Sequence, residues 1–209
     1  MLPSIVRSVS EKSHPAEFDL LCQPKNPRIS IRSANVEDIP NIYQLIERNV
    51  SFSVAPPAVM RFAMAINRNN IIVFCRHGEV VGVYAMLMLT ASGLEALLLG
   101  EFEGLDPKPA QLASRLETPA AVYQWLVVAP GLAAEGIASV SRFLRDPFYR
   151  AANLYMRSAS QAGVRISTAL GFEPVGGART RDLYRYVRLV NRARLADAAS
   201  AADSLPDAA

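Results

Sequence analysis

The feature that most constrains this chain is an apolar segment joined to a helical pattern by a short turn rich in Gly and Ala. The apolar segment, from Val122 to Val128, is strand-like, and Pro130 follows it. The helical pattern opens at Gly136, and its apolar positions are Ile137, Val140, Phe143 and Leu144. A helix start leaves backbone N–H groups unpaired, so it can hold a phosphate or pyrophosphate where small residues allow close approach. The same pattern also occurs in ordinary strand-to-helix connections, and this stretch alone leaves both interpretations open.

The residues from Leu154 to Gly176 extend this alternation of strands and helices. Their pattern predicts a strand, then a helix that ends at Gly171, and then another strand. The chain therefore carries two strand-and-helix signals in succession, at a spacing that fits one α/β domain.

Together, these two stretches resemble the GNAT superfamily of acyl-CoA-dependent N-acyltransferases. In that family the fourth strand leads through a turn of pattern Arg/Gln-x-x-Gly-x-Gly/Ala into a helix, and the turn amides hold the coenzyme A pyrophosphate. Residues Ala133 to Ala138 occupy this pattern, with Ala133 where Arg or Gln is usual. Farther on, Ser160 stands at the family's Asn position, Ser167 stands at its Tyr position, and Gly171-Phe172 is its closing pair.

The resemblance implies an α/β (α+β) fold with a GNAT-like, mixed and mostly antiparallel central sheet of about seven strands, flanked by helices and with a splayed fourth strand. It also implies acetyl-CoA, or another acyl-CoA, as the cofactor. The implied activity is that of an N-acetyltransferase, which acylates a primary amine by direct transfer in a ternary complex. The expected acceptor is a small-molecule amine or a protein amino group.

Two further hypotheses remain open. The departures at Ala133, Ser160 and Ser167 allow a catalytically degenerate acyl-CoA-binding or regulatory domain of the same fold. Acylation of an amine linked to nucleic acid, such as aminoacyl-tRNA, is motivated only by the Arg residues of the carboxyl-terminal half. The net charge of +3 is too small by itself to imply a nucleic-acid partner, so none is expected.

The resemblance implies that cofactor binding depends mainly on backbone groups. The splayed fourth strand would offer the backbone of Leu126, Val127 and Val128 to the pantetheine and to the thioester carbonyl. The amides at the start of the following helix would hold the pyrophosphate. The expected residues after the strand are Ala133, Ala134, Glu135, Gly136, Ile137, Ala138, Ser139 and Ser160.

The catalytic side chains are less typical of the family. Amine acylation requires a neutral amine, a donor that stabilises the oxyanion, and a group that protonates the departing thiolate. Ser167 stands at the acid position, but a hydroxyl is a far poorer acid than a Tyr phenol with its pKa of about 10. Tyr155 and Tyr123 are phenols near the expected active strands, and the base candidates are Tyr123, Glu101 and Glu103. The expected catalytic residues are therefore Ser167, Tyr123 and Glu101.

Cysteine and histidine usage favours a reducing cytoplasm and no metal site. Cys22 and Cys75 are the only cysteines and form no CxxC motif, while His14 and His77 stand alone. The excess of Arg over Lys is typical of a GC-rich genome, and we expect a bacterial protein. Val80 to Gly100 approaches the ~20 residues of a membrane span, but its glycines favour a buried strand followed by a loop, so no membrane partner is expected.

The chain is expected to contain one domain with two tails. Residues 1–27 read as a loose arm, 28–192 as the acyltransferase domain and 193–209 as a flexible tail. Within the domain, residues 91–119 form an insertion that the resemblance places at the border of the acceptor site, with a short helical pattern from Ala110 to Leu116. The alternation from Leu183 to Val190 predicts the last strand. Members of the family often dimerise, and the sequence leaves open whether this chain forms a homodimer.

Overall fold

The computed structural model describes residues 29–131, 134–158 and 161–193, so the expected amino-terminal arm and nearly all of the expected tail lie outside it. Its strands are β1 (Ser30–Ser33), β2 (Ile71–Arg76), β3 (Glu79–Leu89), β4 (Ala121–Val128), β5 (Asn153–Arg157), β6 (Glu173–Pro174) and β7 (Leu183–Tyr186). Its helices are α2 (Ile39–Asn49), α3 (Pro57–Ile66), α4 (Ala91–Leu99), α5 (Ala134–Phe143) and α6 (Gln161–Ala169), with short 3-10 turns η1 (Val36–Asp38), η2 (Arg68–Asn70) and η3 (Pro109–Gln111). None of the helices formed by these residues has the length and apolarity needed to span a bilayer.

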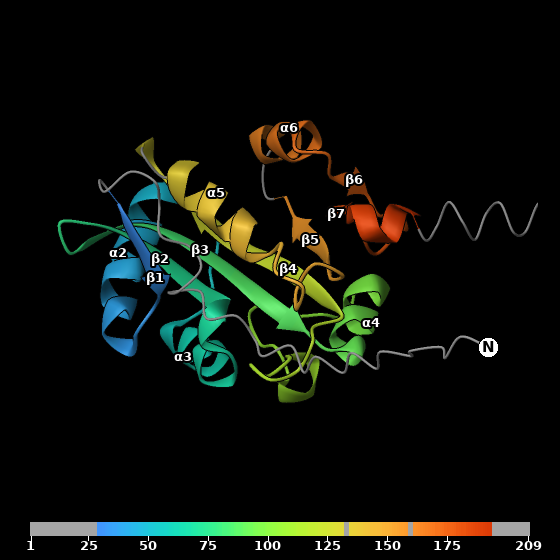
Figure 1. The fold of residues 1–209 in the computed structure, drawn as a ribbon, viewed down its shortest axis with the longest axis horizontal. Helices are drawn as coiled ribbons and strands as arrows, with labels where there is room; N and C mark the ends of the chain where they lie inside the picture. The colour runs from blue at the N-terminus through green and yellow to red at the C-terminus, as the bar shows by residue number, and fades with distance from the viewer. Residues whose placement is uncertain (1–28, 132–133, 159–160, 194–209) are drawn as a thin grey trace, which may run out of the picture.

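The strands form one seven-stranded sheet in the order β1-β2-β3-β4-β5-β7-β6 (Figure 1). Every neighbouring pair is antiparallel except β4 and β5, which run parallel. A parallel pair needs a crossover connection, and here α5 lies in the chain between the two strands. The expected mixed, mostly antiparallel sheet of about seven strands, flanked by helices, is confirmed.

Two residues with positive φ form the turn of the β2–β3 hairpin. His77 and Gly78 have φ values of +50° and +86°. Positive φ at both central residues is the signature of a type I′ turn, whose twist matches that of antiparallel strands. His77 is therefore a turn residue.

Helix α2 is preceded by a hydrogen-bonded cap around Asp38. The Asp38 carboxylate accepts a hydrogen bond from the Asn35 backbone N–H at 2.7 Å. It also accepts two from the Arg32 guanidinium, at 2.6 and 2.8 Å. The hydrogen bonds from Arg32 hold the pKa of Asp38 below its ordinary value, although burial acts in the opposite direction. One carboxylate thus ties β1 to the entry of α2.

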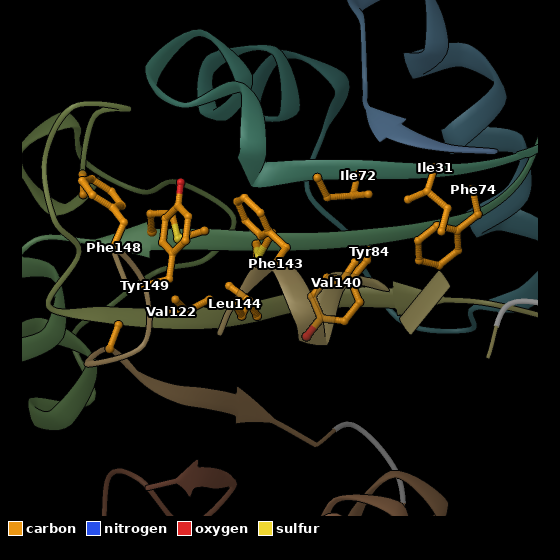
Figure 2. Packing of buried hydrophobic residues seen from close by; sticks show 14 of the residues in the cluster. Ile31, Ile72, Phe74, Tyr84, Val122, Val140, Phe143, Leu144, Phe148 and Tyr149 are labelled. Atoms are coloured by element: carbon orange, nitrogen blue, oxygen red, sulfur yellow. The ribbon is translucent and has the colours of Figure 1, made fainter. Parts of the chain in front are cut away.

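The two faces of the sheet bury separate apolar clusters. On one face, Tyr84 of β3 belongs to a cluster with Phe74 of β2 and with Val140 and Phe143 of α5 (Figure 2). On the other face, Ala85 of β3 belongs to a cluster that includes residues of α2 and α3. This alternation of adjacent β3 residues follows from the period of two in a strand. Helix α5 therefore covers one face, and α2 and α3 cover the other.

Helix α5 lies very close to β2 because Gly136 has no side chain. A Cβ at Gly136 would lie 2.7 Å from atoms of the Phe74 ring, which is fully buried. Such a distance is far inside van der Waals contact, so the glycine allows the helix to rest directly on the ring. The position of the start of α5 thus depends on this pair.

The segment after β3 differs from its expected structure. The sequence favours a loop after Thr90, but α4 begins at the next residue, Ala91. The Thr90 hydroxyl accepts a hydrogen bond from the Gly93 N–H at 3.2 Å and so caps the helix. Gly93 also allows close approach, because a Cβ there would lie 2.1 Å from the Gln111 carbonyl oxygen. Thr90 therefore caps a helix where a loop was expected.

The expected helix from Ala110 to Leu116 is wrong. Only η3 is helical in this range, and Leu112 forms an isolated bridge with Leu89 of β3. The Ala113 N–H donates to the Met88 carbonyl at 2.8 Å. These backbone groups are paired with β3, so they are not available for a helical ladder.

The last strand, β7, is shorter than the predicted range from Leu183 to Val190. It ends at Tyr186, and the chain becomes helical soon afterwards. Between the two, the Arg188 guanidinium donates to the Leu144 carbonyl at 3.0 Å and to the Ala152 carbonyl at 3.1 Å. These bonds hold the chain against the end of α5 and the start of β5. The alternating apolar and polar pattern of the sequence thus extends beyond the residues that pair in β7.

The two parallel strands separate halfway along β4. Their ladder covers four residue pairs and ends at Gln124 and Met156, while the pairing of β4 with β3 continues to Val128. Trp125 marks the start of the separation. It has no Cα partner in β3, although both of its neighbours do, which makes it a β-bulge. The expected splay of the fourth strand is present.

Candidate functional site

A cavity of about 960 Å³ opens where β4 and β5 separate. Its wall contains residues from both faces of the sheet. Tyr84 and Val127 belong with the apolar cluster under α5, whereas Ala85 and Leu126 belong to the cluster under α2 and α3. The cavity therefore passes between the strands and connects the two faces.

Two sides of this cavity can be distinguished by the elements that form them. The α5 side is formed by α5, β5, α6 and the start of β6, through Ile137, Ser141, Leu144, Leu154, Met156, Gly163, Ile166, Ser167, Leu170 and Phe172. The α3 side is formed by α3 and by the chain after α2 and after α4, through Asn49, Val50, Phe52, Ser53, Val54, Ala55, Met60, Gly104 and Leu105. The charged residues of the wall are Arg145, Arg157, Asp182 and Arg188.

The β4 residues expected to bind the cofactor lie at the opening. Leu126 and Val127 line the cavity, and Val128 is buried beside them. None of the three pairs with β5, so their backbone groups on that edge have no ladder partner there. An unpaired strand edge at a cavity can offer N–H and C=O groups to a ligand with amides of its own.

The expected residues after β4 fall in different environments. Ala133 and Ser160 lie outside the described residues. The first turn of α5 runs from Ala134 through Glu135 to Gly136, and these are the amides that a helix start leaves without an intrahelical acceptor.

The later residues of this expected set lie within the α5 ladder. The backbone amides of Ile137, Ala138 and Ser139 come after the first turn, where a helix uses them internally. Ile137 nevertheless lines the cavity with its side chain, whereas Ser139 is fully buried and its Oγ accepts a hydrogen bond from Arg142 at 3.2 Å. Of these three residues, Ile137 is therefore the one that can contribute to the site, through its side chain.

Ser167 lies in the cavity wall, but its hydroxyl proton is already used. Its Oγ is 2.7 Å from the Gly163 carbonyl oxygen and 3.0 Å from the Met156 sulfur. A hydroxyl has one proton, and the carbonyl is the stronger acceptor of the two. Ser167 therefore presents an acceptor to the cavity, which is not the arrangement of an acid that gives a proton to a thiolate.

Tyr123 also lies in the wall, and its environment keeps it protonated. The ring packs edge-on against Phe102, with 5.5 Å between the ring centroids. Burial raises the pKa of the Tyr123 phenol above its ordinary value, and the nearby Arg157 only partly opposes this effect. The phenol is thus a proton donor at neutral pH and a poor candidate for a base.

An ion pair adjoins Tyr123 in the cavity wall. Arg157 Nη1 lies 2.5 Å from Asp182 Oδ1, and both residues line the cavity. Among the described residues, the Asp182 carboxylate is the only acidic side chain of the wall, and its charge is compensated by the guanidinium. The pair therefore adds polar groups near Tyr123 with little net charge.

The structure does not bring the acidic candidates of the insertion into the site. Neither Glu101 nor Glu103 belongs to the cavity wall. Gly100 ends α4 in the left-handed conformation, and the Glu101 side chain beyond it is 61% exposed and 3.8 Å from Arg179. Gly104 and Leu105 are the insertion residues that line the cavity.

A second phenol, which the sequence did not single out, lies against a cavity amide. The Tyr84 hydroxyl donates to Gln124 Oε1 at 3.0 Å, and both residues line the cavity. Burial strongly raises the pKa of Tyr84, so this phenol remains a donor. With Oε1 held in this way, the Gln124 Nε2 group is left as a donor, and no acceptor for it occurs among the described side chains and backbone.

Gln124 carried a signal in the sequence, whereas the Arg157–Asp182 ion pair did not. Gln124 is the only amide side chain in the apolar run from Val122 to Val128, and a polar residue in a buried strand calls for a partner. The Arg157–Asp182 pair joins residues 25 positions apart, and no local pattern marks such a contact.

Comparison with known proteins bears on the fold. No protein-family model matches the chain, and no curated protein sequence matches it. Among solved structures, the loading GNATL domain of CurA from Lyngbya majuscula is similar with a TM-score of 0.52 and 10% identity, over 76% of this chain and 97% of that one. The diaminobutyrate acetyltransferase EctA from Paenibacillus lautus has a TM-score of 0.48 and 13% identity, over 75% and 93%. The GphF GNAT-like decarboxylase, in complex with isobutyryl-CoA, has a TM-score of 0.48 and 18% identity, over 69% and 72%.

The fold can be identified from these observations taken together. The CurA domain aligns over nearly its whole length, and the seven-stranded, mostly antiparallel sheet and the splay of β4 agree with what the sequence resemblance implied. At this level of identity the similarity concerns the fold and not the chemistry. The chain has the GNAT fold.

Proposed function

We propose that this chain is an N-acyltransferase that moves an acyl group, an acetyl group in the simplest case, from an acyl-CoA to a primary amine. The observation that carries the proposal is the cavity between β4 and β5, because its wall reaches both faces of the sheet. Such a passage allows two substrates to meet at one point from opposite faces. Holding both in a ternary complex removes much of the entropic cost of a bimolecular reaction.

The α5 side of the cavity is the proposed site of the acyl-CoA. The unpaired edge of β4 at Leu126 and Val127 has backbone groups free for the amides of a pantetheine chain. The first turn of α5, beginning at Ala134, offers amides to phosphate groups. Ile137 and Leu154 supply an apolar wall between these polar points. The bound acyl-CoA supplies the activated thioester carbonyl.

Tyr123 is the proposed proton donor. In the overall reaction the amine nitrogen bonds to the acyl carbon, the carbon–sulfur bond breaks, and the proton lost by nitrogen balances the one gained by sulfur. The Tyr123 hydroxyl holds a proton at neutral pH because burial raises its pKa, and it lines the cavity. This residue therefore takes the role that the resemblance would have given to Ser167.

Gln124 is the proposed donor to the oxygen of the thioester carbonyl. It stands at the last paired position of the β4–β5 ladder, where the strands begin to separate. The Tyr84 hydroxyl fixes its Oε1, so Nε2 is oriented before any ligand binds. A preorganised N–H donor stabilises developing negative charge more effectively than a mobile one.

A second candidate function is an acyl-CoA-binding domain without catalysis. The observation that favours it is the hydrogen bond from Ser167 to the Gly163 carbonyl, which removes the proton at the usual acid position. The two functions differ in one respect that can be measured: only the transferase releases free thiol from acyl-CoA in the presence of an amine.

The first experiment is a calorimetric titration with acetyl-CoA and longer acyl-CoAs, followed by a thiol-release assay with mixed primary amines. Two variants of α6 form a matched pair: Ile166→Glu adds a negative charge at a cavity residue, and Thr168→Glu adds one at an exposed residue outside the wall. Ile166→Glu should weaken acyl-CoA binding by about tenfold, and Thr168→Glu should leave it nearly unchanged. Equal affinities in the two variants, or no binding to the wild-type protein, would contradict the assignment of the α5 side.

A further inference from the structure

We propose that the acceptor is a primary monoamine carried on an apolar body, such as an aryl or branched alkyl group, and that it binds at the α3 side of the cavity. This inference rests on the proposed acyl transfer and names the chemical class of its acceptor. It follows from the composition of the wall, the charges that the wall carries and the exposure of the apolar side chains.

The wall on the α3 side has no charged side chain among the described residues. Asn49 and Ser53 are its polar members, and the other side chains are apolar. The insertion carboxylates that would suit a cationic acceptor lie elsewhere, since Glu101 is near Arg179 and neither it nor Glu103 lines the cavity. A second ammonium group on the acceptor would therefore be desolvated here without a counter-charge, which is strongly unfavourable.

The charges of the cavity wall lead to the same conclusion. Asp182, the one carboxylate that the described part of the chain adds to the wall, is already paired with Arg157 at 2.5 Å. Arg145 and Arg188 add positive charge, so the wall as a whole is cationic. A polyamine would be repelled by this potential, whereas a monoamine can enter in its neutral form, which is also the nucleophilic form.

Apolar side chains at the α3 side are left exposed to solvent. Phe52 is 50% exposed and Leu105 is 48% exposed, and both line the cavity. Trp125 also lines the cavity, and Gly104 lets the chain approach its indole, because a Cβ there would lie 3.3 Å from the indole nitrogen. An aromatic or branched ligand that covers these side chains would gain apolar contact that the free protein lacks.

Trp125 makes this binding measurable without catalysis, since it is the only tryptophan of the chain. Titration of the full chain with 2-phenylethylamine should change the Trp125 fluorescence and saturate. Spermidine, at matched ionic strength, should cause no saturable change. In the thiol-release assay with acetyl-CoA, kcat/KM for 2-phenylethylamine should exceed that for spermidine by about tenfold or more.

A pair of variants tests the site itself. Phe52→Asp places a charge in the α3 wall and should weaken 2-phenylethylamine binding by about tenfold or more. Leu116→Asp makes the same change at a residue that is 79% exposed and outside the wall, and should bind like the wild type. Thermal melting of both variants checks that each remains folded.

The outcomes separate this inference from the proposed function. Turnover with spermidine in preference to 2-phenylethylamine would overturn the acceptor class and leave the acyl transfer standing. Saturable quenching by octanoyl-CoA but by no amine would overturn it as well, because the α3 side would then hold the acyl chain. Amine binding that saturates and is lost in Phe52→Asp supports the site even if no thiol is released, a result that would count against the acyl transfer alone.

Discussion

Replacing Gly136 by Ala tests how tightly α5 is pressed against the sheet. A Cβ at Gly136 would lie 2.7 Å from three atoms of the Phe74 ring. The same ring is also bounded by Gly82 of β3, where a Cβ would lie 2.6 Å away. Because Phe74 is fully buried between the two glycines, it has little space into which it could move.

The expected magnitude is the difference between two opposing effects. Alanine is favoured over glycine in a helix interior by about 1 kcal/mol. Overpacking a dense core costs about 1–3 kcal/mol. The net expectation is a loss of about 1 kcal/mol in the free energy of unfolding, which for a domain of this size lowers Tm by about 2–4 °C.

Urea unfolding of four proteins would measure this balance: the wild type, Gly136→Ala, Phe74→Leu and the double variant. Once the ring is removed, Gly136→Ala should change sign and become stabilising by about 1 kcal/mol. Ala138→Gly, at an exposed position of the same helix, measures the helix propensity alone. If Gly136→Ala were stabilising by the same amount in both backgrounds, the close contact between α5 and Phe74 would be refuted. Larger residues at Gly136, such as Glu, would displace α5 as well as hinder a phosphate, so they do not isolate cofactor binding.

Three further predictions concern chemistry and acid stability. Tyr123→Phe should lower kcat by about 100-fold, with an unchanged Kd for acyl-CoA by calorimetry. The wild-type rate should hold into the alkaline range, because the raised pKa keeps the Tyr123 phenol protonated. A decline in rate well below the ordinary phenol pKa of about 10 would argue against Tyr123 as the proton donor. Gln124→Glu keeps an acceptor for Tyr84 but removes the N–H donor, so kcat should fall by about 100-fold, whereas Tyr84→Phe should cost less because it only loosens the amide; equal effects of the two changes would contradict the proposed role of Nε2. Asp38 has a lowered pKa in the folded state, so it contributes stability above the ordinary value of 3.8 and loses it as the pH falls through the folded value. Asp38→Asn should therefore cost about 1–3 kcal/mol at neutral pH and much less in acid, and a gap between the two proteins that does not shrink on acidification would speak against the Arg32–Asp38 bond.

The parts of the fold that could be predicted from sequence are those with local causes. The β2–β3 hairpin follows from a glycine that takes positive φ at Gly78, and the end of α6 follows from Gly171, whose φ is +85°. The strand β4 and the helix α5 follow from periodicity, although α5 starts two residues before Gly136. These signals lie within a few residues of the structure they predict.

The errors arise where a distant contact decides the outcome. The expected loop after Thr90 is a helix, because the Thr90 hydroxyl caps α4 and also donates to the distant Ala110 carbonyl at 2.7 Å. Glu101, a catalytic candidate from the sequence, lies outside the cavity wall, beyond the turn at Gly100. Periodicity and composition contain no information about such tertiary pairings, so the side chains of a site are harder to predict than its backbone.

The lack of information about tertiary pairings also explains which site residues could be predicted from the sequence. The backbone of Leu126 and Val127 could be assigned to the opening, because a splay is a property of strands and not of side chains. The Tyr84–Gln124 hydrogen bond joins residues 40 positions apart, on neighbouring strands whose register no local pattern specifies. Proton donors and oxyanion donors in this chain depend on contacts of that kind.

The short ladder between β4 and β5 also has a mechanical consequence. Strands β1 to β4 form one antiparallel block and β5, β7 and β6 form another, and the parallel ladder that joins the blocks contains only four residue pairs. Arg188 also links the two blocks, because its guanidinium donates hydrogen bonds to carbonyls at the end of α5 and before β5. The smaller block is therefore the natural unit of partial unfolding, and its amides should exchange with solvent earlier than those of β2 and β3. A ligand that spans the gap would hold the two blocks together. Binding in the cavity should therefore slow amide hydrogen exchange in β5 and β7, far from the atoms that react.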